Sequence, residues 1–327
     1  MRQYTIRRES WPLLEPFVIA RFTQNTSEVV VVEITEDGIT GVGECERAEA
    51  FEPHMPDTVA TLETARDEIE RGVDRMGLLD VMDAGPARAA VDCALWDLEA
   101  KRSGKAAWQL AGLTQPKALT TAYTLVLDTP DAVAKAAARN ADRPLLKLKL
   151  GGKDDIERVA AARAGAPEAR LIVDANEAWS VDMLGPYMNA MAAHGVELVE
   201  QPLPRGQDAA LNTVEHLVPI CADESCHDRA TLKDVVGYYD YINIKLDKTG
   251  GLTEALLLAE DAVAKGLGLM VGCMIGTSLA MAPAMLIGGL ADRFVDLDAP
   301  LLLARDRDPG IVFDGSVMSP ASPNVWG

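Results

Sequence analysis

The sequence predicts an α/β protein built on a large barrel, because short apolar strands and helical stretches alternate over its C-terminal two thirds. Eight strand-like segments recur at a spacing of about one βα unit, and seven helical stretches separate them. Eight such units imply a closed ring of parallel strands. A doubly wound open sheet is the alternative that the pattern leaves open. The expected strands are 119–127, 145–151, 170–176, 197–203, 219–225, 240–246, 268–274 and 293–298.

A module of another kind precedes the barrel. The first 47 residues are β-rich, with a strand at 28–34 and a turn signal at 36–38. Residues 56–113 are helical, and within 87–101 the apolar residues recur at three- and four-residue spacing. We therefore expect an α+β domain over residues 1–117.

The barrel domain is expected at 118–308. The remaining segment, 309–327, contains a Gly-Ile-Val-Phe-Asp-Gly sequence that is typical of a hairpin, and we expect it to return to the first module. No long linker or low-complexity segment separates these parts.

Composition limits the possible functions. The 327 residues are 48% hydrophobic and carry a net charge of −19, which argues against binding to nucleic acid or to an anionic membrane. No run of about 18 apolar residues occurs, so no membrane span is expected. The five cysteines include no CxxC pair, which favours reduced thiols and a cytoplasmic location.

The second expected strand carries two lysines on one face. With a period of two, Lys147 and Lys149 point away from the leucines of the same strand. Burial of a cation is costly. Either this is an edge strand with a solvated lysine face, or a function requires the two charges.

Charged residues at the ends of other strands favour a function. Barrel enzymes place their chemistry at the C-terminal ends of the strands, and six of the eight expected strands end at a charged residue. From the second strand to the sixth, successive charges are 22 to 26 residues apart, about one βα unit. The set comprises Lys147, Lys149, Asp174, Glu200, Asp223, Lys245, Asp296 and Asp298.

Three of these carboxylates predict a metal site. Asp174, Glu200 and Asp223 follow adjacent strands, and they would repel one another without a cation among them. Ligands that are all oxygen suit Mg²⁺, with Mn²⁺ as an alternative. We expect no residues that bind any other cofactor.

The lysines are expected to face each other. The second and sixth strands are four apart in a ring of eight, so Lys149 faces Lys245, while Asp296 and Asp298 face the metal. Mg²⁺ on a substrate carboxylate would stabilise the enediolate that forms when the α-proton leaves. Two bases on opposite faces then predict racemisation or epimerisation. We expect the charges of Lys147 and the metal to lower the pKa of Lys149.

These motifs resemble the muconate-lactonizing-enzyme subgroup of the enolase superfamily, over essentially the whole chain. Lys147 and Lys149 match its Lys-x-Lys motif, Lys245 matches its sixth-strand lysine, and the three carboxylates match its metal ligands. The helix at 87–98 looks like its last cap helix. The resemblance implies a modified TIM barrel, (β/α)7β, with an α+β capping domain formed by the N-terminal region and the C-terminal tail.

The resemblance also implies substrate contacts. Asp296 and Asp298 resemble the Asp-x-Asp motif of the dipeptide epimerases, which binds the substrate's ammonium group, and Lys147 is placed with the substrate-binding residues. Arg21 sits where an arginine binds the glutamate side chain in the L-Ala-D/L-Glu epimerase branch; a surface arginine in a mobile loop is the alternative. Thr124 resembles a substrate-contacting position, and a strand threonine satisfied by the backbone is the alternative.

The expected function is that of a Mg²⁺-dependent dipeptide epimerase in peptidoglycan peptide metabolism, with a small-molecule dipeptide such as L-Ala-D/L-Glu as its partner. The alternatives are o-succinylbenzoate synthase, N-acylamino acid racemase and muconate cycloisomerase of the same subgroup, whose substrates lack a free ammonium. A non-catalytic metal-binding barrel is a remote alternative. Specificity in this family lies largely in cap loops, here around residues 13–25 and 48–57. Assembly into a homo-oligomer is compatible with the sequence.

Overall fold

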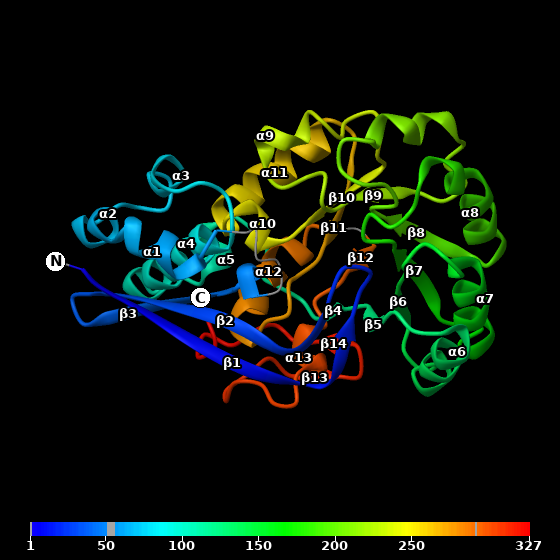
Figure 1. Cartoon of the computed structure of the whole chain (residues 1–327). Coiled ribbons are helices and arrows are strands. Elements are labelled where there is room, and N and C mark those ends of the chain that lie inside the picture. Colours follow the sequence, from blue (N-terminus) through cyan, green and yellow to red (C-terminus); the bar gives the residue numbers. More distant parts are fainter. Residues whose placement is uncertain (1, 51–55, 292) are drawn as a thin grey trace.

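The computed structural model describes residues 2–50, 56–291 and 293–327, so part of the second cap loop, 51–55, lies outside the described residues. A three-stranded antiparallel sheet with helices stands beside a ring of parallel strands that is surrounded by helices (Figure 1). Within the described residues, no helix is long and apolar enough to cross a membrane.

The N-terminal sheet consists of β1 (Gln3–Val18), β2 (Thr23–Glu36) and β3 (Ile39–Glu46), in the order β1-β2-β3. All three strands are antiparallel. The expected turn lies between β2 and β3, where Asp37 and Gly38 have φ values of 53° and 80°. Most side chains of β2 from residue 29 to 34 are buried, because this strand lies between its two neighbours and against a helix.

The helix on this sheet is α4 (Pro86–Ser103), which confirms the helix expected at 87–101. Gly41 and Gly43 of β3 permit its close approach, because a Cβ at these positions would lie 2.2 Å from Ala94 O and 2.1 Å from Ala90 O. The other elements of this region are η1 (Ala48–Ala50), α1 (Thr58–Thr64), α2 (Arg66–Arg71), α3 (Leu78–Val81) and α5 (Ala107–Leu110).

Eight parallel strands form the second sheet and follow one another in sequence order. They are β5 (Tyr123–Leu125), β6 (Leu145–Lys149), β7 (Arg170–Asp174), β8 (Val196–Glu200), β9 (Ile220–Ala222), β10 (Tyr241–Ile244), β11 (Gly268–Val271) and β12 (Phe294–Val295).

The first and last of these strands meet. The main-chain N–H of Ala122 donates to Val295 O (2.7 Å), and that of Leu297 donates to Thr121 Oγ1 (2.7 Å). One side chain from each strand or its first flanking residue fills the interior: Ala122, Leu145, Ile172, Leu198, Cys221, Tyr241, Met270 and Phe294. The predicted closed barrel is therefore confirmed, and the open sheet is excluded.

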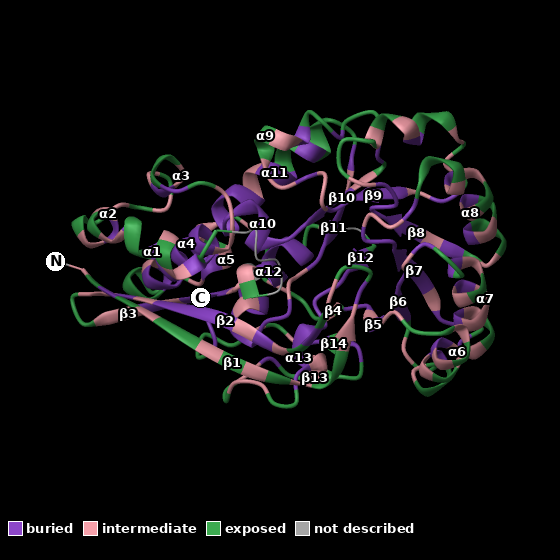
Figure 2. Cartoon of the chain, in the orientation of Figure 1, coloured by how far each residue is buried: buried purple, intermediate pink, exposed green. Residues whose placement is uncertain are grey.

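Helices cover the outside of the ring (Figure 1). In Figure 2 the barrel strands are largely buried, whereas α6, α7 and α8 expose residues on one side. The helices are α6 (Pro130–Arg139), α7 (Asp155–Gly165), α8 (Val181–Ala193), α9 (Arg229–Leu232), α10 (Leu246–Thr249), α11 (Leu252–Ala264), α12 (Ser278–Gly288) and α13 (Ala299–Leu302).

Two details differ from the sequence prediction. The connection from β8 to β9 holds a 3₁₀ segment, η2 (Asp208–Thr213), in place of an α-helix, and it contains three prolines, Pro202, Pro204 and Pro219, which lack the N–H that a helix interior needs. The first expected strand, 119–127, divides into β5 and the separate strand β4 (Leu119–Thr120).

The C-terminal segment forms the expected hairpin, with β13 (Phe313–Asp314) pairing with β14 (Val317–Met318). β14 also pairs with β4, just before the barrel begins. Further on, Trp326 Nε1 donates to Cys93 O in α4 (3.0 Å). The chain thus ends against the cap region, as Figure 1 shows.

Candidate active site

The strand-end charges come together at one end of the barrel. Lys149 is paired in register with Asp174, and Asp174 is paired with Glu200. Asp223 and Lys245 directly follow β9 and β10. Because side chains alternate across a strand, residues in the same register on neighbouring strands point into the ring together.

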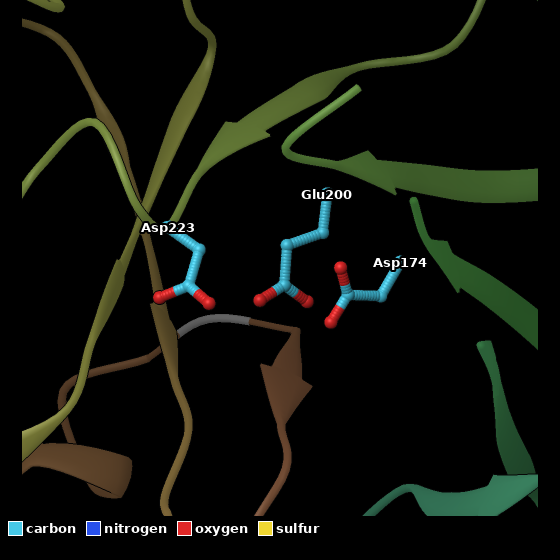
Figure 3. A group of neighbouring side chains, drawn as sticks. All are labelled: Asp174, Glu200 and Asp223. Atoms are coloured by element: carbon cyan, nitrogen blue, oxygen red, sulfur yellow. The ribbon is translucent and has the colours of Figure 1, made fainter. Parts of the chain in front are cut away.

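Asp174, Glu200 and Asp223 form a buried carboxylate cluster. Their side chains point toward one another in Figure 3, and one ligand oxygen from each lies within 4.8 Å of the others. None is more than 2% exposed. Glu200 Oε2 and Asp223 Oδ1 accept no hydrogen bond from the described residues, and their one close cationic contact is a lysine Nζ at 2.6 Å, that of Lys147 and Lys248 respectively. Buried anionic oxygens of this kind fit a hard cation, and all-oxygen ligation fits Mg²⁺.

Each of the two expected bases touches this cluster. Lys149 Nζ lies 2.6 Å from Asp174 Oδ2, and Lys245 Nζ lies 2.7 Å from Asp223 Oδ2. Their strands, β6 and β10, are four apart in the ring of eight. The two ammonium groups therefore approach the carboxylates from opposite sides of the barrel.

Neighbouring carboxylates raise the pKa of two lysines of the site, Lys245 and Lys147. Burial lowers the pKa of Lys245, but the carboxylates of Asp223 and Glu200 outweigh burial and raise it well above its usual range. For Lys147, burial is likewise outweighed by Asp296, Glu200 and Asp174. A cation that neutralised these carboxylates would remove the cause of the upward shift.

Lys147 is directed at carboxylates. Its Nζ lies 2.6 Å from Glu200 Oε2, 2.7 Å from Asp296 Oδ2 and 3.2 Å from Asp174 Oδ2, and the residue is 1% exposed. Three acidic neighbours therefore compensate the charge of Lys147.

Asp296 and Asp298 lie just beyond β12, opposite β8 in the ring. Asp296 is paired with Lys147, whereas Asp298 Oδ2 accepts a hydrogen bond from the main-chain N–H of Thr124 (2.7 Å). Burial, followed by the charge of Asp296, raises the pKa of Asp298 from 3.8 to about 7. Thr124 thus acts on Asp298 through both its main-chain N–H and its side chain.

Arg21 lies in the turn between β1 and β2 and reaches the barrel mouth. Its Nη1 atom lies 2.8 Å from Glu177 Oε2 and 2.9 Å from Glu224 Oε1. Nearby, Leu127 N–H donates to Val18 O (3.0 Å). These contacts tie the tip of the β1–β2 hairpin to the barrel, although Arg21 itself is exposed.

Several polar residues of the site escape the sequence pattern. Glu177 and Gln201 have positive φ values of 67° and 34°, which are uncommon for non-glycine residues. Lys248 Nζ lies 2.6 Å from Asp223 Oδ1. Asn243 Nδ2 donates to Glu200 Oε1 (2.7 Å).

The fold and the site define a metal-dependent barrel enzyme with two opposed lysines. Residues 1–112 match the family model described as "Mandelate racemase / muconate lactonizing enzyme, N-terminal domain", and residues 131–320 match "Enolase C-terminal domain-like". The chain belongs to the enolase superfamily.

Its relatives are epimerases and racemases, and the chain is an isomerase of this class. It is 45% identical to the L-Ala-D/L-Glu epimerase of Escherichia coli (strain K12), over 96% of this chain and 98% of that protein. It is 44% identical to an N-acetyl-D-glutamate racemase of a Pseudoalteromonas species, over 79% of this chain and 81% of the relative.

A solved structure gives the same relationship. An enolase family member from Agrobacterium tumefaciens, with homology to dipeptide epimerases and with bound sodium and L-Ala-L-Glu, is 48% identical to this chain. The alignment covers 100% of both chains with a TM-score of 0.96.

Proposed function

We propose that the protein is a Mg²⁺-dependent dipeptide epimerase that inverts the α-carbon of the C-terminal residue, with L-Ala-D/L-Glu as the favoured substrate pair. The observation that carries this proposal is the placement of Lys149 and Lys245 on strands four apart, each in contact with the carboxylate cluster. Two bases on opposite faces of one carbon allow a proton to leave from one side and return from the other.

The proton transfers follow from this placement. Asp174, Glu200 and Asp223 would hold Mg²⁺, which supplies positive charge for the substrate carboxylate as the α-carbon becomes acidic. One lysine, as the neutral amine, takes the α-proton and becomes an ammonium group. The other, as an ammonium group, gives a proton to the opposite face. The reverse reaction exchanges the two roles, so neither epimer needs a separate site.

The dipeptide would be bound at both ends. The carboxylate of Asp298 suits the free ammonium of the first residue, because a charge-assisted hydrogen bond is stronger than a neutral one. Arg21 lies at the mouth, where its guanidinium suits the side-chain carboxylate of a glutamate. Lys147 and Thr124 line the floor, and Thr124 holds Asp298 in position. The names of the E. coli and Agrobacterium proteins support this substrate.

Incubation in D₂O tests the proposal. L-Ala-L-Glu and a small dipeptide panel are incubated with the protein and Mg²⁺, and NMR follows deuterium at each α-carbon. We expect exchange at the C-terminal α-carbon with formation of the second epimer. Absence of deuterium there in every dipeptide would refute the function.

The second candidate function is racemisation of an N-acyl amino acid, and the similarity to the N-acetyl-D-glutamate racemase favours it. Such a substrate has no free ammonium, and Asp296 is already paired with Lys147. N-acetyl-L-glutamate in the same D₂O assay separates the two candidates. Faster exchange with the acylated substrate than with L-Ala-L-Glu would favour the racemase.

We further propose that the domains divide as 1–117, 118–308 and 309–327, and that the protein works in the cytoplasm, in salvage of peptidoglycan peptides. The first boundary falls in the stretch between α5 and β4, and the last follows α13. Five cysteines without a CxxC pair support a reducing compartment. We place no nucleic acid or membrane among its partners, given the net charge of −19.

A further inference from the structure

Asn243 lies inside the barrel and takes no part in the proton transfer described above. It belongs to β10 and is 1% exposed. Its Nδ2 donates a hydrogen bond of 2.7 Å to Oε1 of Glu200, on β8 two strands away. The opposite orientation of the amide would place Oδ1 against a carboxylate oxygen, so the contact also fixes the amide. One oxygen of Glu200 is thereby committed to Asn243.

The neighbouring strand leaves space for this amide. Gly272 directly follows β11, and its N–H donates to Ile244 O (3.0 Å). A Cβ at Gly272 would lie 2.7 Å from both Nδ2 and Oδ1 of Asn243. Any larger residue at the end of this strand would therefore displace the amide from Glu200.

The second oxygen of Glu200 is not bound by Asn243 but forms an ion pair with a lysine. Oε2 lies 2.6 Å from Lys147 Nζ, and a metal ion would share this oxygen with the ammonium group. Asp174 resembles Glu200 in that one of its oxygens, Oδ1, accepts a hydrogen bond, here from the main-chain N–H of Asn176 (2.9 Å). Substitution of Asn176 would leave its main-chain N–H in place, whereas substitution of Asn243 removes the side-chain donor to Glu200.

We propose that Asn243 is a positioning residue that restricts Glu200 to ligation through a single oxygen and thereby favours Mg²⁺ over Ca²⁺; this rests on the metal-dependent function proposed above. Mg²⁺ demands near-ideal octahedral geometry at about 2.0–2.1 Å, whereas Ca²⁺ takes six to eight oxygens and accepts two from one carboxylate. The hydrogen bond from Asn243 takes up one lone pair of Oε1 and holds the carboxylate in one orientation, which disfavours ligation of one ion by both oxygens of Glu200.

Metal affinities of the full-length protein without substrate test the proposal. Isothermal titration calorimetry with MgCl₂ and, separately, CaCl₂ gives a Kd for each ion. We expect Asn243→Leu, which keeps the size but not the donor, to weaken Mg²⁺ binding about tenfold or more. Ca²⁺ binding should weaken less or improve, so the ratio of the Ca²⁺ Kd to the Mg²⁺ Kd falls about tenfold. Both ions have the same charge, so a changed field in the site cancels in this ratio.

Gly272→Ala provides a second variant, which keeps Asn243 but displaces its amide. The ratio of the Ca²⁺ Kd to the Mg²⁺ Kd should fall in this variant too. Gly185→Ala in α8 is the matched control, because an added Cβ there meets no atom within 4 Å. Thermal unfolding in EDTA identifies any variant that does not fold. A ratio equal to that of the wild type in folded Asn243→Leu and Gly272→Ala protein overturns the proposal. Failure of the epimerase function would appear separately, as absence of deuterium exchange by the wild type.

Discussion

Lys147 and Asp296 form a buried ion pair, with 2.7 Å between Nζ and Oδ2. The same ammonium lies 2.6 Å from Glu200 Oε2, so it links a carboxylate of the eighth barrel strand to the metal-ligand cluster. The sequence treats Asp296 and Asp298 as an equivalent pair that binds the ammonium of a substrate. In the structure they differ, because the charge of Asp296 is already compensated while Asp298 accepts a neutral main-chain N–H.

Asp298 should therefore contribute more than Asp296 to substrate binding. We expect Asp298→Asn to raise KM for L-Ala-L-Glu about 10- to 100-fold, because a hydrogen bond to a charged group contributes about 1.5–3 kcal/mol. Asp296→Asn should raise KM less but lower the melting temperature more, since it removes a partner of buried Lys147. Steady-state kinetics and thermal unfolding of both variants measure this. Equal effects of both substitutions on KM and on stability would contradict it.

The pKa of Asp298 should make its contact with the substrate ammonium depend on pH. Burial and then Asp296 raise that pKa to about 7, with Thr124 and Lys147 acting in the opposite direction. The raised pKa means that protonation favours the folded state, so the contribution of this group to stability is full below about pH 4 and is lost as pH rises to about 7. Binding of an ammonium needs the ionised form. KM for L-Ala-L-Glu should therefore fall as pH rises through about 7.

The matched control for this profile is Asp298→Asn, whose KM should lose that pH dependence. N-acetyl-L-glutamate, which has no ammonium, should show none of it in the wild type. A wild-type KM that is flat between pH 6 and 8 would rule out this role for Asp298.

Deuterium labelling should distinguish the roles of Lys149 and Lys245. We expect Lys149→Met and Lys245→Met each to reduce epimerisation by about 10²- to 10⁴-fold, the usual contribution of a general base. Each variant should retain exchange of deuterium with only one epimer, because one face of the α-carbon keeps its base. NMR of each pure epimer in D₂O measures this, with exposed Lys153→Met as the control. Loss of exchange with both epimers in both variants would contradict two independent bases.

Much of the site could be predicted because parallel strands place equivalent positions together. Lys149, Asp174 and Glu200 interrupt apolar strands at the same register, and the structure pairs them as Cα neighbours. A charge at the end of a buried strand is a strong signal because burial of an unpaired charge is so unfavourable. The order of the strands in the ring then fixed which residues face each other.

The residues that escaped prediction lack such a signal. Asn243 is neutral and alternates with apolar neighbours as any strand residue does, so its hydrogen bond to Glu200, 43 residues away, is visible only in three dimensions. The position of Glu177 depends on its left-handed backbone conformation, which the local sequence does not predict. The difference between Asp296 and Asp298 likewise depends on how far the long side chain of Lys147 reaches across the barrel.

Arg21 should determine selectivity for an acidic C-terminal residue. Its Nη1 is held by Glu177 and Glu224, which places a cation at the barrel mouth beside the metal-ligand strands. We expect Arg21→Gln to raise KM for L-Ala-L-Glu about tenfold or more while leaving a dipeptide with an apolar C-terminal residue nearly unchanged. Glu177→Gln should shift selectivity in the same direction but less, since the partly exposed ion pair contributes about 1 kcal/mol or less.

The control for this comparison is Arg71→Gln, which removes an arginine whose side chain is 66% exposed on α2. Kinetics with L-Ala-L-Glu and L-Ala-L-Leu give the selectivity ratio for each variant. If Arg21→Gln weakens both substrates equally, Arg21 serves only to fasten the hairpin to the barrel, because a purely structural contact cannot distinguish one side chain of the substrate from another. A loss confined to the glutamate dipeptide instead requires that the guanidinium meets the substrate, and Glu177 then acts by holding it there.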